Sequence, residues 1–145
     1  MRKMDFDYSE FVCKCKIRDC DKKEQFLRTI VPIKDRVYYA MDRLDVFKAF
    51  VRSEKKTEKC VIIITSGVRC KKHNQNVGGV KNSFHLYEST KAVAFDCKVI
   101  VDDVQLPDAE VITLFKKFFG SKIKYIAPTS QTKGAVHVTL GFSNE

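Results

Sequence analysis

The sequence predicts an α+β fold in which N-terminal helices pack on a small antiparallel sheet. Helical periodicity of apolar residues comes early in the chain, whereas most runs rich in β-branched residues come later. Helices and strands grouped in this way favour an antiparallel sheet over alternating strand–helix units. A length of 145 residues fits one domain, and we expect that domain to span residues 1–145.

Two early segments have the features of helices. Residues 22–31 predict a short helix, which Pro32 ends because proline cannot donate to a helix and restricts the residue before it. Residues 34–52 predict a longer helix. Its apolar residues recur at helical spacing: Val37, Met41, Leu44, Phe47, Phe50 and Val51.

Four segments predict strands, because they have strand length and are rich in β-branched residues. They are residues 60–65, 91–101, 122–127 and 135–142. The last two flank a polar turn and are expected to pair as a hairpin. Between the second and third strands we expect a helix, because Pro107 has the favoured first-turn position, acidic residues follow it and Gly120 ends the segment.

Residues 1–21 form a lead-in segment, in which the aromatic residues from Phe6 to Phe11 are expected to dock on the domain. Three of the six cysteines cluster in this segment, and a fourth could complete a structural metal site. These candidate ligands are Cys13, Cys15, Cys20 and Cys70. Their spacing is not the paired Cys-x-x-Cys pattern, so the alternative is that they are reduced or buried thiols.

The net charge of +9 allows two interpretations. One is a solvated, lysine-rich surface, and the other is attraction to a polyanion such as nucleic acid or an anionic cell wall. Because the basic residues are spread along the chain, a dedicated nucleic-acid-binding arm is disfavoured. No apolar run approaches the roughly 18 residues of a membrane span, and the charged start lacks the apolar stretch of a signal peptide. We therefore expect synthesis in the cytoplasm.

Three polar residues in or next to strand-type runs are candidate metal ligands. Residues 66–90 form a long loop rich in Gly, Asn and Ser, and loops of this length are usually functional. His85 lies in this loop, Asp96 follows an apolar strand run, and His137 lies in an alternating strand. Together they can supply the three protein ligands of a catalytic zinc. The structural alternatives are a surface histidine in the loop and a hydrogen-bonded histidine in the strand.

The motifs around these residues appear in a characteristic order. They are Ser66-Gly67-Val68-Arg69, His73-Asn74, Val77-Gly78-Gly79, Ser83-Phe84-His85, Ala92-Val93-Ala94-Phe95-Asp96 and His137-Val138-Thr139. This order resembles the zinc D-Ala-D-Ala carboxypeptidases of peptidase family M15, particularly the short forms encoded by bacteriophages. The segment Ser9–Cys15 also resembles the start of those phage forms. The resemblance extends from about Phe6 to Phe142.

The resemblance implies that His85, Asp96 and His137 bind one catalytic Zn²⁺ and that His73 stays outside the ligand set. It implies that Arg69 binds a carboxylate or peptide carbonyl of the substrate, although a surface or ion-paired arginine is the alternative. The implied function is that of a phage-encoded peptidoglycan peptidase in cell-wall degradation. It would be a D-alanyl-D-alanine carboxypeptidase or an endopeptidase acting on the stem peptide. It would be made in the host bacterium and act on the wall after release.

Three features depart from the family pattern. Asp96 follows His85 by eleven positions, about four more than in the family, so residues 87–91 carry an insertion. Ala92 replaces the family's glycine, and Thr139 replaces the aspartate after the last histidine. The family also has a carboxylate near that histidine as general base, yet no Asp or Glu occurs between Glu110 and His137.

Glu88, inside the insertion, is the candidate substitute for this base. Loss of a general base typically lowers the rate by about 10²–10⁴-fold. Zinc alone lowers the pKa of its bound water to about 7, which leaves some hydroxide without any base. The missing base leaves open an inactive zinc-fold module that binds the cell wall. The net charge leaves open a basic accessory protein that binds nucleic acid.

Overall fold

The computed structural model describes residues 6, 10–11, 33–67, 92–129 and 134–141, and every structural statement below concerns these residues. The helix predicted for residues 22–31 and most of the lead-in segment lie outside them. The described elements are α1 (Ile33–Lys55), β1 (Cys60–Ser66), β2 (Ala92–Val101), β3 (Val104–Gln105), α3 (Asp108–Phe119), the 3₁₀ turn η3 (Gly120–Lys122), β4 (Ile123–Pro128) and β5 (Val136–Gly141).

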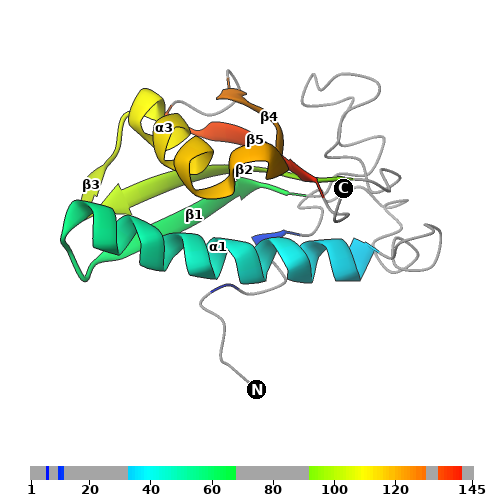
Figure 1. Ribbon diagram of the computed structural model, residues 1–145, viewed down its shortest axis with the longest axis horizontal. Helices are drawn as coiled ribbons and strands as arrows, with labels where there is room; N and C mark the ends of the chain where they lie inside the picture. Colours follow the sequence, from blue (N-terminus) through cyan, green and yellow to red (C-terminus); the bar gives the residue numbers. More distant parts are fainter. Residues whose placement is uncertain (1–5, 7–9, 12–32, 68–91, 130–133, 142–145) are drawn as a thin grey trace, which may run out of the picture.

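The strands form one antiparallel sheet with the order β1-β2-β5-β4, and β3 pairs with the end of β2 (Figure 1). The predicted α+β class and the predicted hairpin of β4 and β5 are confirmed. Strand β3 was not predicted, because two residues are too short for a periodic signal. Of the two described helices, α1 precedes the sheet and α3 lies between β3 and β4.

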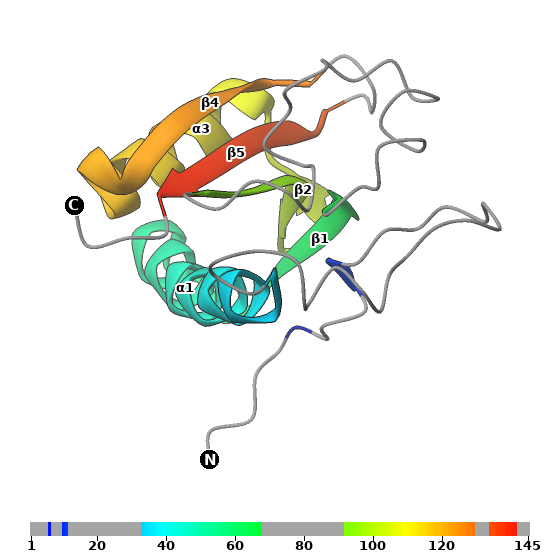
Figure 2. The same ribbon diagram turned by 90° about the vertical axis from the view of Figure 1, so that its right-hand side faces the viewer.

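Both helices lie on the same side of the sheet (Figure 2). Helix α1 packs against β1 and β2, and α3 packs against β4, β5 and α1. Helix α1 runs three residues beyond the predicted end, and the chain then turns at Lys56, whose φ is 53°. Helix α3 follows Pro107 as predicted, and it ends where Gly120 adopts a φ of 55°, a value that glycine tolerates without strain.

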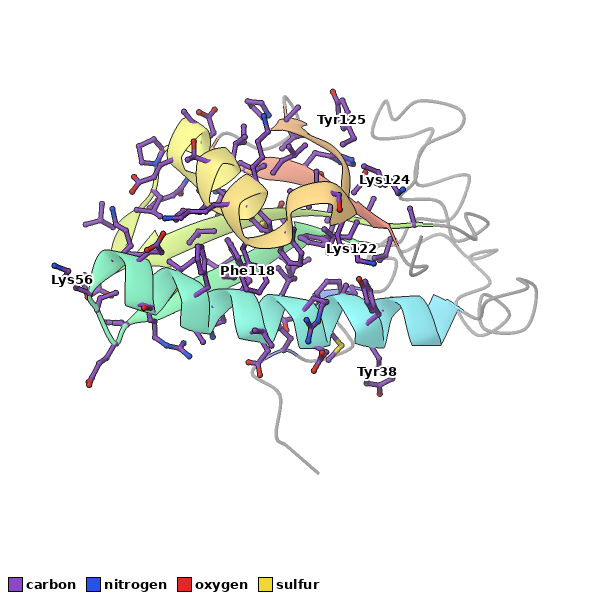
Figure 3. All side chains as sticks on the ribbon, viewed as in Figure 1. Tyr38, Lys56, Phe118, Lys122, Lys124 and Tyr125 are labelled. Carbon is purple, nitrogen blue, oxygen red and sulfur yellow. The ribbon has the colours of Figure 1, made fainter. Side chains whose placement is uncertain are left out.

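Phenylalanines join the two helices over the sheet. Phe47 of α1 stacks on Phe115 of α3, with ring centroids 4.1 Å apart, and also contacts Phe118 and Phe119. Figure 3 shows Phe118 pointing into the space between the helices. Two ion pairs, Lys55–Glu110 and Lys117–Glu54, link the same helices at the surface. Exposed pairs of this kind stabilise little, so the aromatic contacts hold the helices together.

The side chains of β2 and β5 alternate between the helix-covered face and the opposite face. Five residues of β2 and three of β5 belong to the core under the helices: Val93, Phe95, Cys97, Val99, Val101, Val136, Val138 and Leu140. Because successive strand residues point to opposite faces, Asp96, His137 and Thr139 lie on the face away from the helices. This face carries the candidate site.

The lead-in segment contributes two aromatic residues to the core. Phe6 and Phe11 are buried, as predicted, and the Phe11 ring lies edge-on to Phe95, with centroids 6.1 Å apart. The Phe11 backbone also lies directly against Gly67, where an added Cβ would come within 2.5 Å of the Phe11 carbonyl oxygen. The glycine of the Ser66-Gly67 motif therefore permits this close approach.

Candidate metal centre

Asp96 and His137 are direct neighbours across the centre of the sheet. In the ladder between β2 and β5, Asp96 pairs with His137, and Ala94 pairs with Thr139. Both strands are internal, so hydrogen bonds on either side fix the backbones that carry these residues. Asp96 and His137 therefore meet because of strand register, although 41 positions separate them in the sequence.

A chain of hydrogen bonds connects Asp96, His137 and Thr139. His137 Nδ1 lies 2.9 Å from Asp96 Oδ1, and His137 Nε2 lies 2.8 Å from Thr139 Oγ1. An ionised carboxylate only accepts hydrogen bonds, so Nδ1–H donates to Asp96. In the neutral ring, Nε2 then accepts a hydrogen bond from the hydroxyl of Thr139. Both ring nitrogens are thereby held, which fixes the orientation of the imidazole.

Burial protects this arrangement from solvent. The Asp96 side chain is 4% exposed, and that of His137 is 19% exposed. On the other face of β2, burial raises the pKa of the Cys97 thiol far above its usual range, and the negative charge of Asp96 raises it further. Burial likewise raises the pKa of Cys60. These two described cysteines are free, protonated thiols.

Two further residues border the pair. Tyr125 of β4 is 58% exposed, and its ring centroid lies 5.7 Å from that of His137. At the β1 side, the ladder shifts register between Ile64 and Ser66, so that Ser66 pairs with Asp96 and Thr65 is the extra residue. Thr65 Oγ1 is buried and has no hydrogen-bond partner in the described part of the chain. A tyrosine ring and a buried hydroxyl thus border the pair.

The family-model comparison gives one match, to peptidase M15, over residues 4–121. The chain belongs to the peptidase M15 family. Peptidases of this family are zinc-dependent and act on peptidoglycan peptides, in agreement with the resemblance seen in the sequence. The matched part of the chain includes Asp96 and ends before His137. Neither a curated protein nor a solved structure matches the chain.

Asp96 and His137 fit a zinc ion in ligand type and in spacing. Carboxylate oxygen and imidazole nitrogen are ordinary zinc ligands, with bonds of about 2.0–2.2 Å. Two such ligands at a tetrahedral angle lie about 3.3–3.6 Å apart. The observed 2.9 Å between Nδ1 and Oδ1 is close to this value, so a small separation of the two side chains would admit the ion.

The structure brings together two of the three predicted zinc ligands. No cluster of three or more His, Cys, Asp or Glu residues that could hold a metal occurs within the described ranges. His85 lies outside those ranges, as do His73, Arg69 and Glu88. The candidate structural ligands Cys13, Cys15, Cys20 and Cys70 lie outside them as well. The roles of all these residues stay predictions.

Tyr125 is a neighbour of the site that was not predicted from the sequence. Tyr125 pairs with Thr139 in the β4–β5 ladder, on the same face as His137. A predicted hairpin indicates that such contacts exist, but its register depends on the turn and on a bulge next to Lys124.

None of the described helices is long and apolar enough to cross a membrane.

Proposed function

We propose that this protein is a zinc-dependent peptidoglycan peptidase, of the D-alanyl-D-alanine carboxypeptidase or stem-peptide endopeptidase type. Family membership supports the general class. The observation that carries the proposal is the contact of Asp96 with His137 on the sheet face away from the helices, because these residues are two of the ligands that the family pattern implies. In this proposal His85 supplies the third ligand.

Each residue of the site has a specific task in this proposal. Asp96 and His137 hold the ion on the rigid centre of the sheet, and Arg69 binds the carboxylate or a carbonyl of the stem peptide. A bound zinc ion supplies a Lewis acid for the scissile carbonyl and promotes ionisation of water near neutral pH. The exposed ring of Tyr125, beside His137, offers an apolar surface on which the substrate can rest.

We also infer that the enzyme is phage-encoded and degrades the wall of its bacterial host after release from the cytoplasm. The net charge of +9 supports this setting, since it favours encounter with an anionic cell wall. Lys122 and Lys124 lie near Tyr125 at the β4 end of the sheet (Figure 3). Lysine side chains at this end of the sheet would attract an anionic polymer.

One observation favours a second candidate, an inactive zinc-fold module that binds the cell wall. Thr139 stands where the family pattern has an aspartate, and its hydroxyl bonds Nε2 of His137. The expected general base near His137 is also missing, because no Asp or Glu occurs between Glu110 and His137 and a hydroxyl cannot replace a carboxylate base near neutral pH. If no other residue replaces that base, substrate binding survives while turnover is lost.

Hydrolysis of purified peptidoglycan distinguishes the two candidates. We expect the zinc-loaded protein to release D-alanine or a cleaved stem peptide, and we expect a chelator to stop this release because the Lewis acid is lost. Mass spectrometry of the soluble products measures both outcomes. Recovery of product release when zinc is added back is the control that the chelator has not damaged the protein. Sedimentation of the protein with peptidoglycan, but no product above the chelated control, would establish the binding module instead.

Replacement of Glu88 by glutamine tests the proposed general base. We expect Glu88→Gln to keep its zinc and to lower kcat by about 10²–10⁴-fold, because the amide cannot accept a proton from water. Glu58→Gln is the matched control, since Glu58 is exposed in the turn before β1. Metal content and kcat are measured on the same preparations. An unchanged kcat in Glu88→Gln would remove Glu88 from the mechanism.

A further inference from the structure

Thr139 is a fully buried polar residue in the centre of the sheet. It is 0% exposed, and its backbone pairs with Ala94 on one side and with Tyr125 on the other. Two ladders therefore fix its position, and the branched Cβ restricts its side-chain rotamer. Buried hydroxyl groups need a hydrogen-bond partner, and Thr139 Oγ1 bonds His137 Nε2 at 2.8 Å. The hydroxyl is thus a fixed anchor for the imidazole ring.

This anchor determines which nitrogen of His137 faces Asp96. With Nε2 held by Thr139, Nδ1 lies 2.9 Å from Asp96 Oδ1, a spacing close to that of two ligands of one zinc ion. If Nε2 were the ligand instead, the ring would have to leave both Thr139 and Asp96. Binding through Nδ1 would keep the contact with Thr139, and it would require Nδ1 and Oδ1 to move apart by about half an ångström and the carboxylate to turn.

The chemistry of a hydroxyl suits both states of the ring. When Nδ1–H donates to Asp96, the lone pair of Nε2 accepts a hydrogen bond from the hydroxyl of Thr139. When a metal takes the lone pair of Nδ1, the neutral ring carries its proton on Nε2, which then donates to Thr139 Oγ1. Threonine can serve in both roles because its hydroxyl is a donor and an acceptor.

We propose that Thr139 is a positioning residue that holds His137 through Nε2 and so presents Nδ1, beside Asp96, as the metal-binding nitrogen. This inference rests on the proposed zinc site. It gives the threonine, which departs from the family pattern, a task of its own. Partners of this kind fix the tautomer and the orientation of a histidine ligand, and their loss typically weakens metal binding by about 10–100-fold.

Zinc affinity of three variants tests the inference without an activity assay. Thr139→Val keeps the shape and lacks the hydroxyl, Thr139→Ser keeps the hydroxyl, and Thr113→Val removes an exposed hydroxyl on α3 that bonds Ala109. We expect Thr139→Val to bind zinc about 10–100-fold more weakly than the parent in competition with a chromophoric chelator. Thr139→Ser and Thr113→Val should remain within a factor of about three of the parent. Equal affinities for the parent and Thr139→Val would overturn the inference.

Nitrogen-15 NMR of the histidine side chains gives a second test, on the parent protein itself. With ¹¹³Cd²⁺ in place of zinc, we expect one-bond coupling between the metal and Nδ1 of His137. Coupling to Nε2 instead would overturn the inference even if Thr139→Val failed to fold. A parent that binds neither zinc nor cadmium would contradict the proposed function as a whole. A parent that binds through Nε2 would contradict only the role of Thr139.

Discussion

Replacement of Asp96 by alanine is expected to weaken zinc binding by at least about 100-fold and to reduce peptidoglycan cleavage to the level of chelated protein. Loss of a ligand should exceed the 10–100-fold cost of losing a group that only supports a ligand. The same change also removes the acceptor of His137 Nδ1–H. An unsatisfied buried donor costs about 1–3 kcal/mol, so the metal-free variant should also unfold more easily.

Isothermal titration with zinc and thermal unfolding with and without chelator measure both effects of Asp96→Ala. A metal that binds only the folded state raises the stability of that state. Chelation should therefore lower the melting temperature of the parent and leave that of the variant unchanged. Asp42→Ala is the matched control, because it makes the same charge change on α1, which packs on the opposite face of the sheet. Parent-like zinc affinity in Asp96→Ala would remove Asp96 from the ligand set.

Replacement of Phe47 by alanine is expected to lower the free energy of unfolding by about 3–5 kcal/mol. Phe47 is completely buried, and its ring stacks on Phe115 and lies 5.7 Å from the ring of Phe119. Its loss would leave a cavity where α1 meets α3. For a chain of this size, the change corresponds to a fall in melting temperature on the order of 10 °C.

Urea denaturation followed by circular dichroism measures the loss in Phe47→Ala. Val104→Ala is the control, because Val104 is 65% exposed and surface changes usually shift stability by less than about 0.5 kcal/mol. Similar midpoints for the two variants would show that the aromatic contacts between the helices contribute little. The result would then assign the stability of the domain chiefly to the sheet.

The longer helices and strands of this fold were predictable because their periodic signals are local, whereas the two-residue strand β3 was not. The apolar spacing from Val37 to Val51 defines the buried side of α1. Alternation in β5 places the side chain of His137 on the other face of the sheet from those of Val136 and Val138. Alternation also predicts that Asp96 and His137 avoid the helix-covered face. It does not predict that they are paired, because pairing depends on the register between strands that are distant in the sequence.

The contacts of individual side chains were harder to predict from the sequence. The hydrogen bond from Thr139 to His137 depends on rotamers that packing selects, and no residue pattern encodes them. The roles of His85 and Arg69 rest on the order of motifs in residues 66–90, which have no helical or strand periodicity. Motif order indicates that such residues serve one site, but it contains no distances.

The placement of β5 also has a consequence for folding kinetics. This strand is the last of the described elements in the sequence, yet it lies between β2 and β4, and β4 has no other strand partner in the described sheet. Contacts between distant parts of a chain form slowly, because a long loop must close first. We therefore expect closure of the sheet and assembly of the Asp96–His137 pair to occur together, late in folding. A chain that has not completed its sheet offers zinc no preformed pair of ligands.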